Sequence, residues 1–155
     1  MFERPASVSR RWRGSRRACC WVNEMVNTIQ QFLQDRGVPA DAIQELVALL
    51  PRKMAEASCS YFYTAKHIMH PDKWFYWPGQ TRFVLVGQCP NGDGIGIDTK
   101  VHPGAIFFIS HEHLDVDAKD EDVTVQVAAS PADYARKIQM GNEDCPMDFW
   151  EAKRS

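Results

Sequence analysis

Apolar residues in the first third of the chain recur at the spacing of α-helices. Two such stripes occur, and Gly37 lies between them at a position typical of a helix end in the left-handed conformation. A second helix is expected to open at Val38–Asp41 and to end at Pro51, because proline cannot continue it. The apolar positions of the two stripes are Trp21, Met25, Ile29, Phe32 and Leu33, followed by Ile43, Leu46, Val47 and Leu50.

The segment between residues 52 and 70 fits two kinds of element. Residues 54–61 carry apolar and small side chains at helical spacing, whereas Tyr61–Thr64 is a run of residues that favours strands. The sequence leaves helix and strand open here. Residues 71–81 are expected to form a loop, because prolines and a Pro-Gly pair bound them.

Short apolar runs joined by turn-rich segments predict an antiparallel meander. Strands are expected at Phe83–Val86, Ile95–Asp98 and Ala105–Ile109, and the glycine-rich segment Asn91–Gly94 is a strong turn signal between the first two. In a fourth strand, Val123–Val127, valines alternate with Thr and Gln. This alternation predicts one buried face and one solvent-facing face.

A helix is predicted after the fourth strand, with Tyr134 and Ile138 directed toward the core. Further along, Phe149 and Trp150 are expected to dock on the body. The order of elements predicts an α+β fold with N-terminal helices, an antiparallel meander of four or more strands, and a C-terminal helix packed on the sheet. The start signal of that helix consists of Ser130 as N-cap, Pro131 at the first helical position and Asp133.

Charge is distributed unevenly along the 155 residues, a length that fits one domain. Residues 1–20 contain six arginines and one acidic residue, so residues 21–155 carry 12 basic and 19 acidic side chains. We expect residues 1–20 to be a disordered tail or translation from an over-extended start codon, and residues 21–155 to form a single domain. The acidic body argues against a nucleic-acid partner, because phosphates require cations.

The cysteine content and the hydropathy of the chain indicate which cellular compartment it fits. The chain has five cysteines, an odd number at irregular spacing, which fits free thiols in a reducing, cytoplasmic environment. No apolar run approaches the ~18 residues of a membrane span, so no membrane partner is expected.

Three segments could carry chemistry. His111, His113 and Asp115 follow the third strand, and two imidazoles with a carboxylate can bind zinc, which makes a small metal-dependent hydrolase one alternative. However, Val116 stands where a further histidine would extend this motif, and no histidine follows His113. The Asn91–Gly94 turn offers a second alternative, a regulatory domain that binds a small ligand through its backbone. No nucleophile–base pattern occurs, so neither catalysis nor a cofactor is expected.

The third segment is a run of acidic residues, which is either a solvated stretch of chain or a surface that faces a basic partner. An EF-hand is not expected, because Asp120 and Gln126 occupy the positions that require Gly and Glu. Trp74–Trp77 is a four-aromatic run expected to be partly buried with one or two rings exposed. The acidic residues are Glu112, Asp115, Asp117, Asp120, Glu121 and Asp122.

The meander resembles the core of the SUKH superfamily, which includes fungal Smi/Knr cell-wall-assembly regulators and many bacterial immunity proteins. The resemblance covers roughly residues 72–140 and implies that residues 21–155 form a SUKH-like domain. It rests on Phe83–Gly87, Cys89–Asp93, Ile95–Asp98, Pro103–Ile109 and His111-Glu112.

The resemblance implies protein binding without catalysis, as in immunity proteins that neutralise toxin domains, often nucleases. The acidic body suits a basic toxin domain, because complementary potentials raise association rates. The expected partner-binding residues are Trp74, Trp77, Asp93, Asp98, Glu112, Asp115, Asp117, Asp120 and Asp122.

Overall fold

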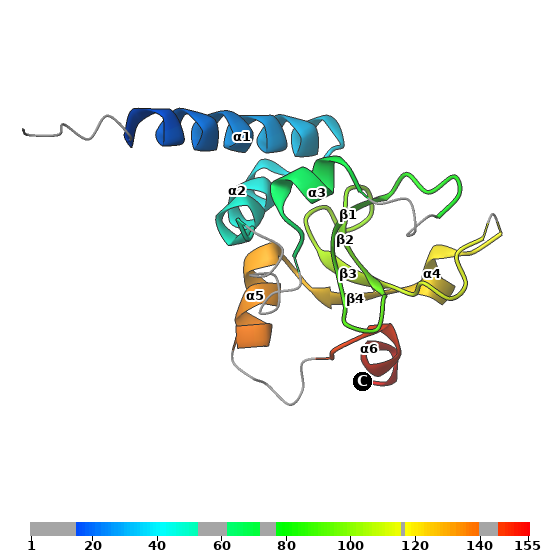
Figure 1. Ribbon diagram of the computed structural model, residues 1–155. Helices are drawn as coiled ribbons and strands as arrows, with labels where there is room; N and C mark the ends of the chain where they lie inside the picture. The colour runs from blue at the N-terminus through cyan, green and yellow to red at the C-terminus, as the bar shows by residue number, and fades with distance from the viewer. Residues whose placement is uncertain (1–14, 53–61, 72–76, 116, 140–145) are drawn as a thin grey trace, which may run out of the picture.

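A four-stranded antiparallel sheet lies at the centre of the computed structural model (Figure 1). Its strands follow one another in space in the same order as in the sequence, so the predicted meander and the α+β class are confirmed. The structure describes residues 15–52, 62–71, 77–115, 117–139 and 146–155, with the backbone alone at 15–22 and 139. The strands are β1 (Phe83–Gln88), β2 (Gly94–Asp98), β3 (Ile106–Ile109) and β4 (Thr124–Ala128).

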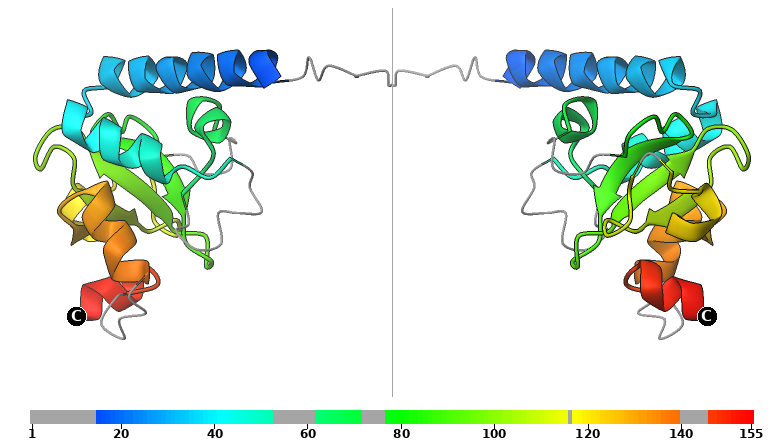
Figure 2. Two further views of the ribbon diagram at one scale, coloured as in Figure 1. Left: turned by 90° about the vertical axis from the view of Figure 1, so that its left-hand side faces the viewer. Right: turned by 90° about the vertical axis from the view of Figure 1, so that its right-hand side faces the viewer.

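Helices precede and follow the sheet, and the views in Figures 1 and 2 place α2 and α5 together over one of its faces. Helix α1 lies across that layer and contacts α2 and α3. Within the part of the chain that the structure describes, no helix is both long and apolar enough to cross a membrane. The helices are α1 (Ser15–Asp35), α2 (Ala40–Leu49), α3 (Ala65–Met69), α4 (Asp120–Val123), α5 (Pro131–Gln139) and α6 (Phe149–Arg154).

The boundary between the first two helices follows the sequence signals. Gly37 has a φ of +83°, the left-handed conformation that was predicted for it, and its N–H donates to the carbonyl of Gln34. Helix α1 starts at Ser15, so its first turns fall inside the segment that was expected to be a tail. The N-terminal 14 residues lie outside the described residues.

The ambiguous segment contains both kinds of structure. Phe62 forms a single bridge to Gly87, and the adjacent Tyr63 N–H donates to the carbonyl of Val86, so this stretch pairs with the edge of β1. Helix α3 follows at once, capped by the side chain of Thr64. The remaining residues of this segment, 53–61, lie outside the described residues.

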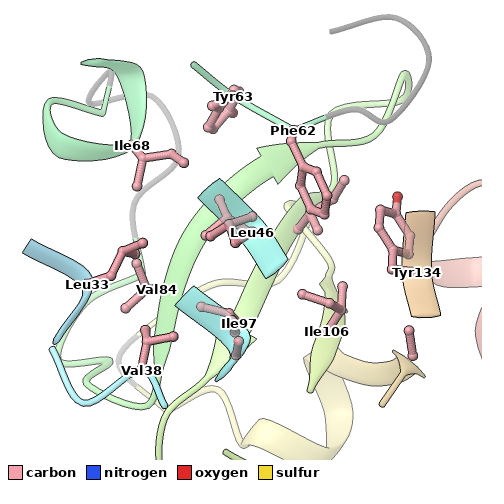
Figure 3. Packing of buried hydrophobic residues seen from close by; sticks show 14 of the residues in the cluster. Leu33, Val38, Leu46, Phe62, Tyr63, Ile68, Val84, Ile97, Ile106 and Tyr134 are labelled. Carbon is pink, nitrogen blue, oxygen red and sulfur yellow. The ribbon is translucent and has the colours of Figure 1, made fainter. Parts of the chain in front are cut away.

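The main hydrophobic core fills the space between the helices and one face of the sheet (Figure 3). Tyr134 of α5 is buried as predicted, and its ring centroid lies 5.4 Å from that of Phe62 and 6.0 Å from that of Phe108. Aromatic pairs at such distances add about 0.5–1.5 kcal/mol to the energy of burial. These contacts join α5, the edge of β1 and strand β3 in one core.

The second face of the sheet is also covered. Phe83, Phe107 and Ile109 are buried there beneath Trp77 and Leu114, which come from loops. The predicted solvent-facing side of the fourth strand is therefore only partly correct. Gln126 is exposed, but Thr124 is buried and its hydroxyl donates to the carbonyl of Asp120.

The loop before β4 ends differently from the prediction. Residues 120–123 form the one-turn helix α4, so the strand begins at Thr124, one residue later than expected. At the other end of β4, Ser130 caps α5 as predicted, because its Oγ accepts from the N–H of Asp133 at 3.2 Å. The Asp133 carboxylate accepts in return from the N–H of Ala129.

Candidate functional site

Asp93, at the end of the turn between β1 and β2, is a buried junction between three segments. Its Oδ1 accepts from the backbone N–H of His111 at 3.1 Å and lies 2.8 Å from the Nδ1 atom of the same residue. Its Oδ2 accepts from the Asn91 amide at 2.7 Å and from the N–H of Phe149, the first residue of α6, at 3.1 Å. One carboxylate thus holds the turn, the segment after β3 and the C-terminal helix together.

Burial alone would raise the pKa of Asp93, since it penalises the charged form. Hydrogen bonds from Asn91, His111 and Phe149 outweigh burial, so the pKa of Asp93 is lowered from its ordinary value. An ionised carboxylate only accepts hydrogen bonds, which places the proton of the His111 ring on Nδ1. The Asp93 side chain is 0% exposed, so its prediction as a partner-binding residue is wrong.

Asp98, at the opposite end of β2, organises the loop that leads to β3. Its carboxylate accepts from the backbone N–H groups of Lys100, Val101 and His102. Arg82 adds two donors, Nε at 3.1 Å and Nη2 at 2.6 Å. Burial acts to raise the pKa of Asp98, but these donors together lower it to about 2. This residue too is 0% exposed, so it cannot meet a partner as predicted.

Arg82 extends this junction to the acidic segment. Its Nη1 lies 2.9 Å from Oδ2 of Asp120, and its guanidinium stacks over the rings of Phe83 and Phe107. Asp120 therefore has a partner inside the molecule and fixes α4 against the sheet. Phe83 is paired with Asp98 in the β1–β2 register, so Arg82 lies one residue beyond the end of this pairing and close to Asp98.

The other predicted acidic residues remain at the surface, and α6 lies beside them. The ring centroid of His113 lies 6.5 Å from that of Trp150, at an interplanar angle of 87°. Lys153 Nζ donates to the carbonyls of Glu121 and Asp122 at 3.3 and 2.9 Å. We name this surface the acidic face; it consists of Glu112, Asp115, Asp117, Glu121, Asp122 and Trp150, all of which are exposed.

A buried side chain and a capping contact hold helix α6, which carries Trp150, in place. Phe149 is buried, and the Asp148 side chain caps the helix by accepting from the N–H of Glu151 at 2.9 Å. The Glu151 carboxylate in turn accepts from the N–H of Met147 at 2.8 Å. The expected docking of the C-terminal segment is confirmed for Phe149, whereas Trp150 is 41% exposed. Sequence reasoning did not name Trp150 as a binding residue.

Trp77 is partly buried, because its ring stacks on Phe83 with a centroid distance of 6.1 Å. It therefore helps to cover the second face of the sheet. Trp74 lies outside the described residues.

The geometry gives the metal-site alternative no support. His111 is directed to Asp93, His113 contacts Trp150, and Asp115 accepts from the N–H of Asp117. Nowhere in the described ranges do three or more His, Cys, Asp or Glu side chains form a group that could hold a metal.

The Asn91–Gly94 turn is filled by the molecule itself. Gly92 has a φ of +104°, and a Cβ built there would lie 3.6 Å from the His111 ring. The side-chain amide of Asn91 donates a hydrogen bond to the carboxylate of Asp93. Cys89 beside the turn is a buried free thiol whose pKa is raised mainly by burial, so it lacks the thiolate character of a nucleophile. These groups favour a structural turn over a ligand cradle.

No family model, curated protein or solved structure matches this chain. The resemblance to the SUKH superfamily rests on the motifs of the meander and stays a prediction.

Proposed function

We propose that this chain is a non-catalytic protein-binding module of the SUKH type, and that it acts as an immunity protein against a basic, nuclease-type toxin domain. The observation that carries the proposal is the acidic face: its exposed carboxylates belong to a segment, residues 112–122, that contacts the anchored helix α6, and α6 carries the exposed Trp150. Trp150 would serve as the central anchor, since tryptophan is enriched among residues that dominate binding energy.

The charges of the acidic face would guide the encounter. Carboxylates that line one surface attract a basic partner and can raise the association rate by about 10- to 1000-fold at low salt. Nuclease domains carry basic surfaces because they bind phosphates, so a carboxylate surface can occupy the same groups. Asp93 and Arg82 support this role from inside, because they hold α6 and α4, the two helices that carry part of the face.

A cytoplasmic location is part of the proposal. A toxin that acts on nucleic acid must be neutralised in the compartment that contains nucleic acid. The buried free thiol of Cys89 fits a reducing environment.

Co-expression tests the proposal. The full chain would be expressed together with each toxin domain encoded beside its gene, and growth of the host would be followed. Rescue of growth by the wild-type chain, and loss of rescue by Trp150→Ala at equal protein level, would support the proposal. If no neighbouring domain is toxic, or if none is neutralised, the immunity function is wrong.

A further inference from the structure

Asn91 precedes Gly92 in the turn between β1 and β2, and Asn-Gly is the dipeptide that most readily loses ammonia from its asparagine side chain. Because glycine has no Cβ, nothing at this residue shields its backbone nitrogen from the preceding side chain. The other asparagines, Asn23, Asn27 and Asn142, are followed by Glu, Thr and Glu. Asn91 is also exposed, so water can reach its side chain. Both its neighbour and its exposure therefore favour deamidation.

Deamidation is an intramolecular attack followed by hydrolysis. The backbone nitrogen of Gly92 attacks Cγ of Asn91, the N–Cγ bond forms, the Cγ–Nδ2 bond breaks, and ammonia leaves with the proton of the Gly92 amide. Water then opens the succinimide ring, adding its hydroxyl to one of the two carbonyl carbons and returning a proton to the nitrogen. Opening at Cγ yields aspartate, and opening at the main-chain carbonyl yields isoaspartate. Both products carry a new carboxyl group, which is ionised at neutral pH.

The contacts of the Asn91 amide prepare it for this attack. Its Oδ1 accepts from the backbone N–H of Asp93 at 3.1 Å, so a donor already points at the oxygen on which negative charge would develop. The Gly92 N–H donates to the carbonyl of Cys89 at 3.0 Å. Because the attacking nitrogen must give up this hydrogen bond and its proton, the reaction should be slow and should accelerate as the pH rises.

The surroundings of Asn91 give the reaction a structural consequence. Its Nδ2 donates to Oδ2 of Asp93 at 2.7 Å, and the same oxygen accepts from the N–H of Phe149, the first residue of α6. Figure 1 shows the turn beside this helix. Deamidation replaces the Nδ2 donor with a carboxylate oxygen, which only accepts. Two carboxylates this close repel each other, and that of Asp93 is fully buried.

We propose that Asn91 is a site of spontaneous deamidation, and that its conversion weakens the attachment of α6 to the body. Asp93 loses a donor and gains a like charge beside it, which disturbs its bond to the N–H of Phe149. Isoaspartate also inserts one backbone atom between Cys89 and Asp93, where the Cys89 N–H donates to the Asp93 carbonyl at 2.8 Å and closes the turn. The inference concerns α6 itself and holds whichever partner the acidic face binds.

Incubation of the purified full chain at mildly alkaline pH tests the chemistry. Peptide mass spectrometry should show NH2 replaced by OH at Asn91, to an extent that increases with time and with pH. An isoaspartate-specific methyltransferase should label the same peptide. Asn27, which is exposed on α1 and precedes Thr28, is the internal control and should stay unmodified. If Asn91 of the folded chain is unchanged when that of the urea-unfolded chain is fully converted, the proposal is overturned.

Two substitutions separate the new charge from the lost hydrogen bond. Asn91→Ala removes both side-chain contacts with Asp93, whereas Asn91→Asp keeps an acceptor for the Asp93 N–H and adds a carboxylate. Asn91→Asp should have the lower urea midpoint at neutral pH, and the gap should narrow in acid, because two neighbouring carboxyls then share a proton. An Asn91→Asp protein at least as stable as Asn91→Ala would show that the new carboxylate turns to solvent and that the proposed repulsion is wrong.

Hydrogen exchange followed by NMR reports the attachment of α6 directly. The Phe149 amide should exchange at least about tenfold faster in Asn91→Asp than in Asn91→Ala, as expected when a buried hydrogen bond is weakened. The Asp133 amide, which donates to Ser130 at the start of α5, is the control and should exchange equally in both. Deamidated wild type, separated by ion exchange, should show the same increase at Phe149. Equal exchange at Phe149 in the modified and unmodified wild type would contradict the proposal.

Discussion

The Nδ1 atom of His111 lies 2.8 Å from Oδ1 of Asp93, and the other oxygen of the same carboxylate accepts the first N–H of helix α6. This relationship ties the turn after β1, the segment after β3 and the C-terminal helix to one buried charge. Because α6 carries Trp150, the position of the proposed binding surface depends on a residue that no partner can touch.

Asp93→Ala should destabilise the fold. The substitution leaves the N–H groups of Phe149 and His111 without their acceptor, and each buried unsatisfied donor costs about 1–3 kcal/mol. Chemical denaturation should show a free energy of unfolding lower by about 3 kcal/mol. Asp117→Ala, at an exposed position, is the control and should change it by less than about 0.5 kcal/mol. Equal effects would mean that Asp93 does not hold the three segments together.

The free energy of unfolding should fall in acid, because the Asp98 carboxylate becomes protonated. The folded state lowers the pKa of this carboxyl from 3.8 to about 2, so the contribution is complete above about pH 4 and is lost as the pH falls toward 2. A shift of this size corresponds to roughly 2 kcal/mol. Asp98→Asn should be less stable than the wild type at neutral pH, and the difference should shrink between pH 4 and 2. A difference that stays constant over this range would show that the charge of Asp98 is not what stabilises the loop.

Arg82 forms two ion pairs, an inner one with the buried Asp98 and an outer one with the partly exposed Asp120, and the two should contribute differently to stability. Arg82→Ala leaves the buried Asp98 carboxylate without its counter-charge and should cost about 3 kcal/mol. Asp120→Ala removes only the outer pair, in which the carboxylate side chain is 42% exposed, and should cost less than about 1 kcal/mol. Urea unfolding of both variants measures the two costs. If the two variants lose similar stability, the inner pair does not dominate.

Gly96 is predicted to be sensitive to substitution on packing grounds. A Cβ at this position of β2 would lie 2.7 Å from Cδ1 of Ile109 and 3.2 Å from Cβ of Phe83. Gly96→Ala should therefore cost about 1–3 kcal/mol through overpacking. Ile109→Val removes the closest methyl group, so the double variant should lose less stability than the sum of the single variants. Thermal unfolding of the three proteins would measure this coupling, and simple additivity would contradict it.

Predictions made from periodic patterns were correct, whereas predictions for polar residues that are buried in the structure were not. The end of α1 at Gly37, the cap at Ser130 and the meander follow from local conformational preferences and from burial patterns, which a sequence displays directly. Asp93 and Asp98 were predicted to bind a partner, a role that needs an exposed side chain, and both are buried. Their burial depends on donors from distant segments, and only the tertiary structure brings those donors to them.

Part of the acidic face could be predicted from the sequence. The exposed acids follow from composition, since a run of carboxylates between two strands is difficult to bury. Trp150 joins them only because Phe149 anchors α6 next to His113. The sequence separation between these residues hides that contact, so neither periodicity nor spacing could have indicated it.

The affinity of the purified full chain for a toxin domain encoded beside its gene tests the central claim most directly. Glu121→Lys and Asp122→Lys lie on the acidic face, whereas Asp35→Lys reverses the same charge at an exposed position of α1. If the acidic face binds a basic partner, the two face variants should slow association by about tenfold at low salt and Asp35→Lys should leave it unchanged. Equal association rates for all three variants and the wild type would contradict the account.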